Sequence, residues 1–114
     1  MAAGNYDITI DEGSDFELTM VVKDGNDPRQ LDGWSARGHL RQSKDTAQYW
    51  AFTFNTLAND GTIVMSLPYN VVDNHGHAAL TAGNYFYDVE IYQGTTAVER
   101  ILQGKAVVTR EVTR

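Results

Sequence analysis

The stretch LTAGNYFYDVEI, residues 80–91, decides the fold class of this chain. Every second residue from Tyr85 to Ile91 is large and apolar, and Asp88 and Glu90 fall between them. Successive side chains of a strand point to opposite faces, so this alternation is typical of a strand with one face in a core and the other in water. The stretch therefore predicts a β-protein.

The residues just before this strand predict how the chain enters it. In immunoglobulin-like sandwiches, a tyrosine near the start of the penultimate strand packs under the preceding corner and hydrogen-bonds the backbone upstream. Leu80, Gly83 and Tyr85 have the spacing of such a structural corner, and glycine adopts the unusual backbone angles that a corner needs. The alternative is that Tyr85 and Tyr87 are ordinary core residues. Both interpretations are structural, and neither places an active site here.

Alternating segments recur along the rest of the chain, with turn residues such as Asp60-Gly61 between them. We predict strands at 6–10, 15–23, 31–42, 48–57, 62–67 and 84–92, and in the segment from 97 to the end. Residues 68–80 do not alternate, and Pro68 with the apolar spacing after it predicts a helical turn or two. The predicted fold is all-β: an immunoglobulin-like antiparallel β-sandwich of about seven to eight strands with one short helical crossover. We expect a single domain over 1–114.

The composition argues against several classes of function. The chain has no cysteine, so it carries neither a thiol nucleophile nor a cysteine-ligated metal. Its formal net charge of −6 disfavours nucleic-acid binding, which requires a basic surface against the phosphates. The beginning, MAAGNYDITI, lacks the basic and apolar regions of a signal peptide, and no apolar run approaches the ~18 residues of a membrane span. We expect no nucleic-acid partner, no membrane segment and no signal peptide.

One loop holds candidate metal ligands. Asp73, His75 and His77 are close enough in sequence to meet on one side of an extended loop, and these residue types suit a three-ligand metal site. The alternative is a solvated loop with turn-forming Asn74 and Gly76. Acidic residues also gather in turns, at Asp11, Glu12, Asp15, Asp24, Asp27 and Asp60. None of these turns has the spacing of a calcium-binding loop, and we expect no cofactor.

Catalytic motifs are missing from the sequence. It contains no phosphate-binding glycine loop, no nucleophile elbow and no serine in a recognisable triad setting. We therefore expect a non-enzymatic protein. A metal-dependent hydrolase that uses His75 and His77 is the catalytic alternative.

Interface candidates lie outside the predicted inward registers and at the chain ends. Tyr49, Tyr69 and Tyr92 are candidate protein-contact anchors; alternatively, they form with Trp50 an exposed platform for sugar rings. The first strand and the tail at 108–114 are candidates for docking through unpaired strand edges, which gives as further interface residues Tyr6, Asp11, Glu12, Arg110 and Arg114. In this hypothesis the two arginines meet the acidic turns of another subunit. The alternative is that the chain ends pair within one sandwich.

Five stretches share the order of one known pattern: YDITIDEGSDFELTMVVKDG (6–25), LDGWSARGHLRQS (31–43), DGTIVMSL (60–67), LTAGNYFYDVEI (80–91) and RILQGKAVVTREVTR (100–114). In this order the chain resembles a family of small immunoglobulin-like β-sandwich domains of tailed-bacteriophage virion proteins. That family includes the N-terminal domains of upper-baseplate proteins. Residues 68–80 depart from the family pattern.

The resemblance implies a function in the phage particle. It implies a non-enzymatic adaptor or assembly subunit of the tail, baseplate, neck or fibre attachment, located in the virion and assembled in the host cytoplasm. The implied partners are other virion proteins and copies of the chain itself in a symmetric assembly. The alternatives are a carbohydrate-binding or host-adhesion module and a capsid decoration (cement) protein.

Overall fold

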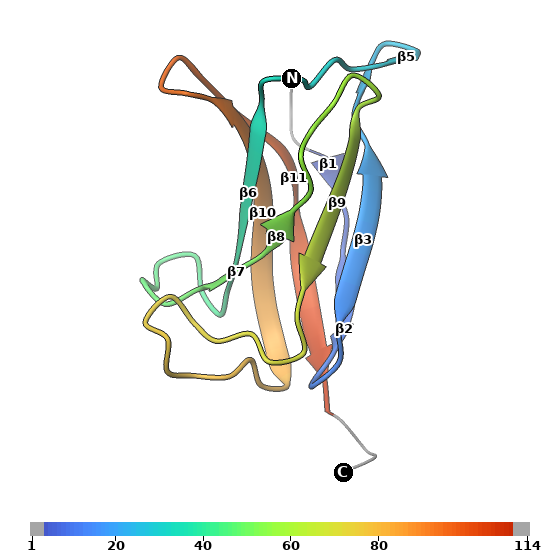
Figure 1. Ribbon diagram of the computed structural model, residues 1–114. Helices are drawn as coiled ribbons and strands as arrows, with labels where there is room; N and C mark the ends of the chain where they lie inside the picture. The colour runs from blue at the N-terminus through green and yellow to red at the C-terminus, as the bar shows by residue number, and fades with distance from the viewer. Residues whose placement is uncertain (1–3, 111–114) are drawn as a thin grey trace.

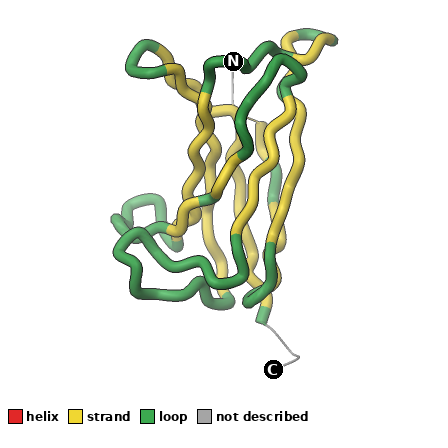
Figure 2. Tube along the Cα trace, viewed as in Figure 1, coloured by secondary structure: helices red, strands yellow, loops and turns green. Residues whose placement is uncertain are grey.

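The computed structural model describes residues 4–110, and in this range the chain forms strands and loops with no helix (Figures 1 and 2). The strands are β1 (Gly4–Asn5), β2 (Ile8–Asp11), β3 (Phe16–Val21), β4 (Lys23–Asp24), β5 (Asp27–Pro28), β6 (Ser35–Arg41), β7 (Trp50–Ala51), β8 (Thr53–Phe54), β9 (Thr62–Leu67), β10 (Gly83–Gln93) and β11 (Ala97–Thr109). The prediction of an all-β chain is confirmed.

Two sheets form the body of the molecule (Figure 1). The first sheet has the strand order β1–β11–β10–β6–β7, with β2 also paired to β11, and the second sheet has the order β3–β9–β8. Strands β4 and β5 form a separate hairpin. The neighbours are antiparallel, except that β1 and β2 run parallel to β11. Inward residues of both sheets share one core, so the arrangement is consistent with a β-sandwich.

The core follows the alternation of the sequence. In β9, Ile63, Met65 and Leu67 are buried, and the residues between them are partly exposed. The largest cluster of buried residues consists of Ile8, Ile10, Leu40, Trp50, Phe52, Met65, Leu67, Tyr85, Tyr87, Val89, Ala106 and Val108. Its aromatic rings meet edge to face, with 5.7 Å between the centroids of Trp50 and Tyr85 and 6.2 Å between those of Phe52 and Tyr87. Each large apolar side chain buried in this way stabilises the fold by roughly 1.5–3 kcal/mol.

The corner before β10 has a tyrosine hydrogen bond of the kind expected. The hydroxyl of Tyr85 donates to the carbonyl oxygen of Thr81 at 2.7 Å, and the Tyr85 side chain is only 1% exposed. Gly83 has a φ of 155°, which side-chain-bearing residues rarely adopt. Leu80 packs against the core beside it. The bond satisfies a phenol that would otherwise be buried without a partner.

The predicted strand at 48–57 is two strands in different sheets. β7 pairs with β6 in the first sheet, and β8 pairs with β9 in the second. Between them, the amide of Phe52 still donates to the carbonyl of Gly38 in the first sheet, at 3.0 Å. Trp50 and Phe52 are both buried although the chain is leaving one sheet for the other. The inward alternation therefore continues across the switch, which is why the sequence pattern does not reveal it.

The helical crossover predicted at 68–80 is wrong. The segment consists of turns and one isolated bridge between Val72 and Ala79. The carboxylate of Asp73 accepts hydrogen bonds from the amides of His75, His77 and Ala78 at 3.0–3.3 Å. A short acidic side chain that bonds nearby amides stabilises a turn in place of a helix.

The N-terminal strand is interrupted where it crosses Gly104. Between β1 and β2, the carbonyl of Tyr6 lies so close that a Cβ built on Gly104 would be 2.2 Å from its oxygen. The hydroxyl of Tyr87 donates to that same carbonyl. Burial raises the pKa of Tyr87 to about 12, and Asp7 and Tyr6 contribute, so the hydroxyl stays protonated as a donor at neutral pH. Because β2 pairs with Ala106–Thr109, this end of the chain forms part of the first sheet, at its edge.

Candidate functional site

The outward side of the first sheet carries an ordered set of charged and aromatic side chains. We call it the charged face. Its rows across β6, β10 and β11 are Arg41–Phe86–Lys105, His39–Asp88–Gln103 and Arg37–Glu90–Arg100. The inward residues of the same strands, such as Leu40, Val89 and Ala106, belong to the core. The pleat therefore directs every alternate residue of β6 and β10 to this face.

Acidic residues on the central strand are flanked by arginines. The Nε of Arg37 lies 2.9 Å from a carboxylate oxygen of Glu90, and the Nε of Arg100 lies 3.5 Å from one of Asp88. The two arginines are about half exposed and the two carboxylates partly exposed, so such pairs contribute at most ~1 kcal/mol each to stability. Their main effect is to fix the orientation of the arginines on the sheet.

Aromatic rings lie next to two further cations, Arg41 and Lys44. The Arg41 guanidinium lies 4.8 Å from the ring centroid of Tyr49, and the Lys44 ammonium lies 5.5 Å from that of Phe86. The ring of Tyr49 also stacks on His39, with 3.8 Å between centroids. Contacts of this kind, worth roughly 0.5–1 kcal/mol at exposed sites, position a cation without neutralising it.

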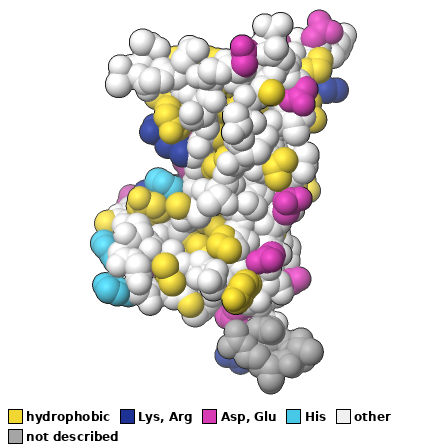
Figure 3. All heavy atoms as spheres, viewed as in Figure 1, with side chains coloured by type: hydrophobic (Ala, Val, Ile, Leu, Met, Phe, Trp, Pro, Cys, Tyr) yellow, Lys and Arg dark blue, Asp and Glu magenta, His cyan; other side chains and the backbone are white. Residues whose placement is uncertain are grey.

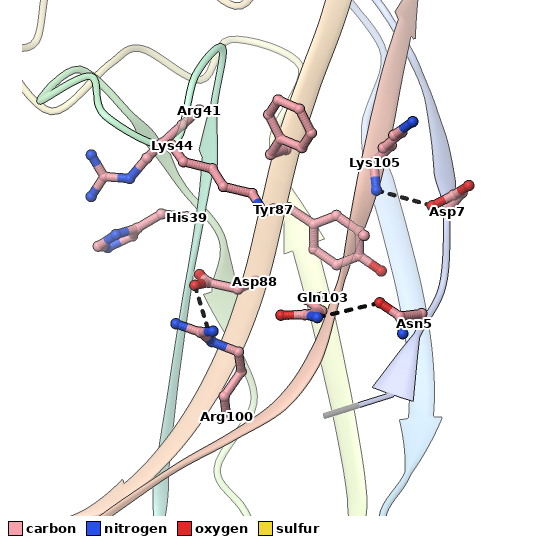
Figure 4. Close-up of a pocket in the computed structure, with 12 residues that line it drawn as sticks. Asn5, Asp7, His39, Arg41, Lys44, Tyr87, Asp88, Arg100, Gln103 and Lys105 are labelled. Atoms are coloured by element: carbon pink, nitrogen blue, oxygen red, sulfur yellow. Dashed lines mark hydrogen bonds and ion pairs between the residues drawn. The ribbon is translucent and has the colours of Figure 1, made fainter. Parts of the chain in front are cut away.

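A hollow of about 390 Å³ opens on this face, between β6, β10, β11 and the chain before β2 (Figure 4). We call it the basic hollow. Its charged lining consists of Arg41, Lys44, Arg100 and Lys105 with Asp7 and Asp88. It thus has four of the nine lysines and arginines of the chain, against two of its 15 carboxylates. A chain of net charge −6 therefore concentrates positive charge at one place.

The distribution of charge is visible over the molecular surface. Figure 3 shows Lys or Arg side chains at the margin beside β6 and also at the hairpin end, and histidines at that margin and over the loops below it. Acidic side chains are spread over the margin of β3 and the hairpin end. Burial lowers the pKa of His39 below its usual value, and the nearby Arg41 lowers it further. His39 is therefore predominantly neutral at pH 7, and the positive charge belongs to arginine and lysine.

Among the predicted interface aromatics, two lie on the charged face. Tyr49 stacks on His39, and Tyr92 lies 4.8 Å under the guanidinium of Arg37. Tyr69 is 65% exposed but lies in the loop after β9, where its amide donates to Asp15 at 2.7 Å. Trp50 is buried, and its indole nitrogen donates to the carbonyl of Ala78. The four rings therefore do not form the exposed platform required by the sugar-binding alternative.

The predicted candidates near the chain ends are mostly engaged within the chain. The Asp11 carboxylate accepts from the Thr109 hydroxyl at 2.8 Å, and Glu12 accepts from the amide of Ala82 at 2.7 Å. These two acids tie the ends of β2, β11 and the loop before β10 together. Tyr6 is 53% exposed at the sheet edge. Arg110 is exposed after β11, and Arg114 lies outside the described residues.

The loop with Asp73, His75 and His77 is arranged around backbone amides. One carboxylate oxygen of Asp73 accepts three amides, and the other accepts from the Gln48 side chain at 2.8 Å. These bonds, with that from Gln48 the strongest, hold the pKa of Asp73 well below its usual range. His75 and His77 are exposed. Within residues 4–110, no three or more His, Cys, Asp or Glu side chains are grouped so as to hold a metal ion.

The sequence pattern does not predict that the cations of the basic hollow meet in one place. Arg37, His39 and Arg41 do alternate in the sequence, which is a signal for an outward basic strip. Lys44, Arg100 and Lys105 join them only through strand register and a loop, which the sequence pattern does not give.

Comparisons with known proteins do not assign the chain to a family. No protein-family model matches the chain, and no curated protein matches it significantly. In the described part of the chain, no helix is long and apolar enough to cross a membrane.

Proposed function

We propose that this chain is a non-enzymatic assembly or adaptor subunit of a bacteriophage virion, in its tail, baseplate, neck or fibre attachment, or on its capsid surface. The chain binds other virion proteins there. The observation that carries the binding role is the charged face, a broad sheet surface where cations and aromatic rings are concentrated in an acidic protein. Arginine and aromatic side chains are enriched in protein–protein interfaces, and complementary charge gives them specificity.

The strand order supports an immunoglobulin-like fold, which the resemblance to phage virion domains implies. The orders β11–β10–β6–β7 and β3–β9–β8 support a match to the two sheets of an immunoglobulin sandwich of the variable type. In that correspondence β10 is the penultimate strand, and Tyr85 at its start bonds the backbone four residues upstream. The parallel pairing of β2 with β11 brings the N-terminal part of the chain to the same sheet as the last strand.

The rigid support of the charged face fits an assembly role. The central strands β10 and β11 are long, and β10 is hydrogen-bonded to a neighbour on each side. Side chains on such strands are held at fixed spacings, so a partner meets the same pattern of charges in every copy. Binding energy is then not used to order a flexible loop.

The test is the composition of the particle. Phage particles produced from the genome that encodes this chain would be purified on a density gradient and analysed by quantitative mass spectrometry. We expect the chain in a fixed ratio to the major capsid protein in particles purified at low salt. Its absence from particles, with abundant chain in the lysate, would contradict the proposal.

A further inference from the structure

The β4–β5 hairpin carries two carboxylates without a partner. It projects from one end of the molecule, and residues 23–28 are all exposed (Figure 1). Asp24 and Asp27 are paired in register across the hairpin, so their side chains lie on the same side of it. Like charges directly opposite each other destabilise a strand pair. Within residues 4–110 neither carboxylate forms an ion pair, and the nearby Arg29 is paired with Glu99 at 2.6 Å.

The basic hollow, in contrast, has cations without acidic partners among residues 4–110. Arg41, Lys44 and Lys105 form no ion pair with any acidic residue of the described chain, and Arg100 has only Asp88 at 3.5 Å. Arg41 is held by the carbonyl of Thr46 at 2.5 Å, a neutral acceptor that fixes its position and leaves its charge. In Figure 4, Arg41 and Lys44 lie on one side of the hollow and Lys105 on the other. A carboxylate placed between them would face cations from two directions.

The size of the hollow suits the tip of a hairpin. Its volume of about 390 Å³ lies in the range of small-ligand pockets, roughly 300–1,000 Å³. The tip of the hairpin is a tight turn through Gly25, which has a φ of 68°, so the carboxylates are presented on a narrow projection. Phe86 and Gln103 in the lining offer a ring and an amide next to the cations.

We propose that the β4–β5 hairpin of one copy of this chain docks in the basic hollow of a second copy. Asp24 and Asp27 then meet Lys44, Lys105 and Arg41, which cancels the like-charge repulsion in the hairpin and supplies the missing acids in the hollow. The contact joins two different parts of the surface, so it gives a reciprocal pair, a ring of copies, or an open filament where the rotation does not close. The inference rests on the proposed function, because it identifies one partner of that assembly as the chain itself.

The contact is small and ionic, which predicts its behaviour. Exposed charges interact over about 30 Å at 10 mM ionic strength and over only about 3 Å at 1 M. Self-association is therefore weak, rises with concentration at low salt and disappears at high salt. Rings or reciprocal pairs gain from several such contacts at once, so assembly in the particle exceeds what one contact gives.

The test uses light scattering and sedimentation of the full chain with two complementary variants. Asp24→Asn/Asp27→Asn removes the hairpin charges and keeps the hollow, and Lys44→Gln/Lys105→Gln does the reverse. We expect the wild type to associate at low salt, and each variant alone to remain a monomer. An equal mixture of the two variants should associate again, as a two-chain complex and no larger, because it restores one contact.

The matched control compares single charges. Glu17→Gln removes one negative charge from the exposed side of β3, and Asp27→Asn removes one from the hairpin. We expect Glu17→Gln to keep the association of the wild type and Asp27→Asn to weaken it at least about tenfold, the loss of one ~1.4 kcal/mol charge contact. A wild type that stays monomeric at low salt, equal effects of the two substitutions, or a mixture that stays monomeric would each overturn the inference. The particle composition tests the proposed function separately, since a chain found in particles but monomeric alone docks on another protein.

Discussion

Replacing Gly104 by alanine tests the close approach of the chain between β1 and β2 to β11. The new Cβ would lie 2.2 Å from the oxygen and 2.8 Å from the carbon of the Tyr6 carbonyl, well inside van der Waals contact. Both atoms belong to the backbone, so no side-chain rotation relieves the overlap. The chain between β1 and β2 must therefore move away from β11.

The cost follows from the bonds that this movement breaks. The Tyr6 amide donates to Gln103 at 2.9 Å, the Lys105 amide donates to the Asp7 carboxylate at 3.0 Å, and the Tyr87 hydroxyl donates to Tyr6. Each bond contributes ~1 kcal/mol, and leaving the buried hydroxyl of Tyr87 without a partner adds a further cost. The free energy of unfolding should therefore fall by about 3–5 kcal/mol. For a chain of this length, 1 kcal/mol corresponds to about 4 °C, so Tm should fall by roughly 12–20 °C.

The assay is thermal unfolding followed by circular dichroism, with hydrogen exchange at the Tyr6 and Lys105 amides. Gly4→Ala is the matched control, because its Cβ would meet atoms at 3.7 Å, an ordinary contact, on the same strand pair. We expect the control to change stability by less than ~1 kcal/mol. If Gly104→Ala unfolds within about 4 °C of the control, the proposed close approach of Tyr6 is wrong.

Three further outcomes are expected. Tyr85→Phe should lower the free energy of unfolding in urea by about 1–3 kcal/mol, because it leaves the Thr81 carbonyl without its donor, and a loss below ~0.5 kcal/mol would argue against the corner. Asp73→Asn should destabilise the protein at pH 7. Because the pKa of Asp73 is depressed in the folded state, its carboxylate stabilises the fold fully above the unfolded-state pKa of ~3.9. This stabilisation is lost as the pH falls below that value. The gap between wild type and Asp73→Asn in urea midpoints should thus close in strong acid, and a gap independent of pH would refute the carboxylate's role. Neither a chelator nor added zinc should shift Tm, since Asp73 is already occupied by amides; a zinc-dependent rise abolished by His75→Ala would show a metal site.

Much of the fold follows from local alternation. The inward residues of β9 and β10 are those that the sequence pattern selects, and the tyrosine at the head of β10 bonds upstream as its spacing suggests. The pattern does not reveal where β7 ends and β8 begins, because the inward side chains of Trp50 and Phe52 continue through the change of sheet. It also misreads residues 68–80, where the hydrogen bonds of Asp73 outweigh the weak helical spacing of the apolar residues.

The charged face is harder to predict, because strand register determines it. A bulge in the pairing of β10 with β11 lies beside Val89 and Glu90. It places Arg100 opposite Glu90 and Gln103 opposite Asp88, so two residues three apart point to the same side. Simple alternation would send one of them into the core. The sequence therefore predicts the basic side of β6 but not the cations of β11 that complete the hollow.

The net charge and the basic hollow have complementary effects. A charge of −6 opposes contact between copies of the chain in most orientations. One concentrated basic site then allows a single orientation of approach for an acidic surface, because other orientations bring like charges together. The charge pattern thus favours specific over indiscriminate association.

We propose that this chain is a virion protein and that its basic hollow contacts another protein in the particle. Zero-length carbodiimide cross-linking of purified particles tests it most directly, because that reagent joins a lysine to a carboxylate only where the two are in contact. We expect links from Lys44 or Lys105 to a carboxylate on another molecule, with Asp24 or Asp27 of a second copy among them. Particles that contain the chain but give no intermolecular link at either lysine, or particles without the chain, would contradict it.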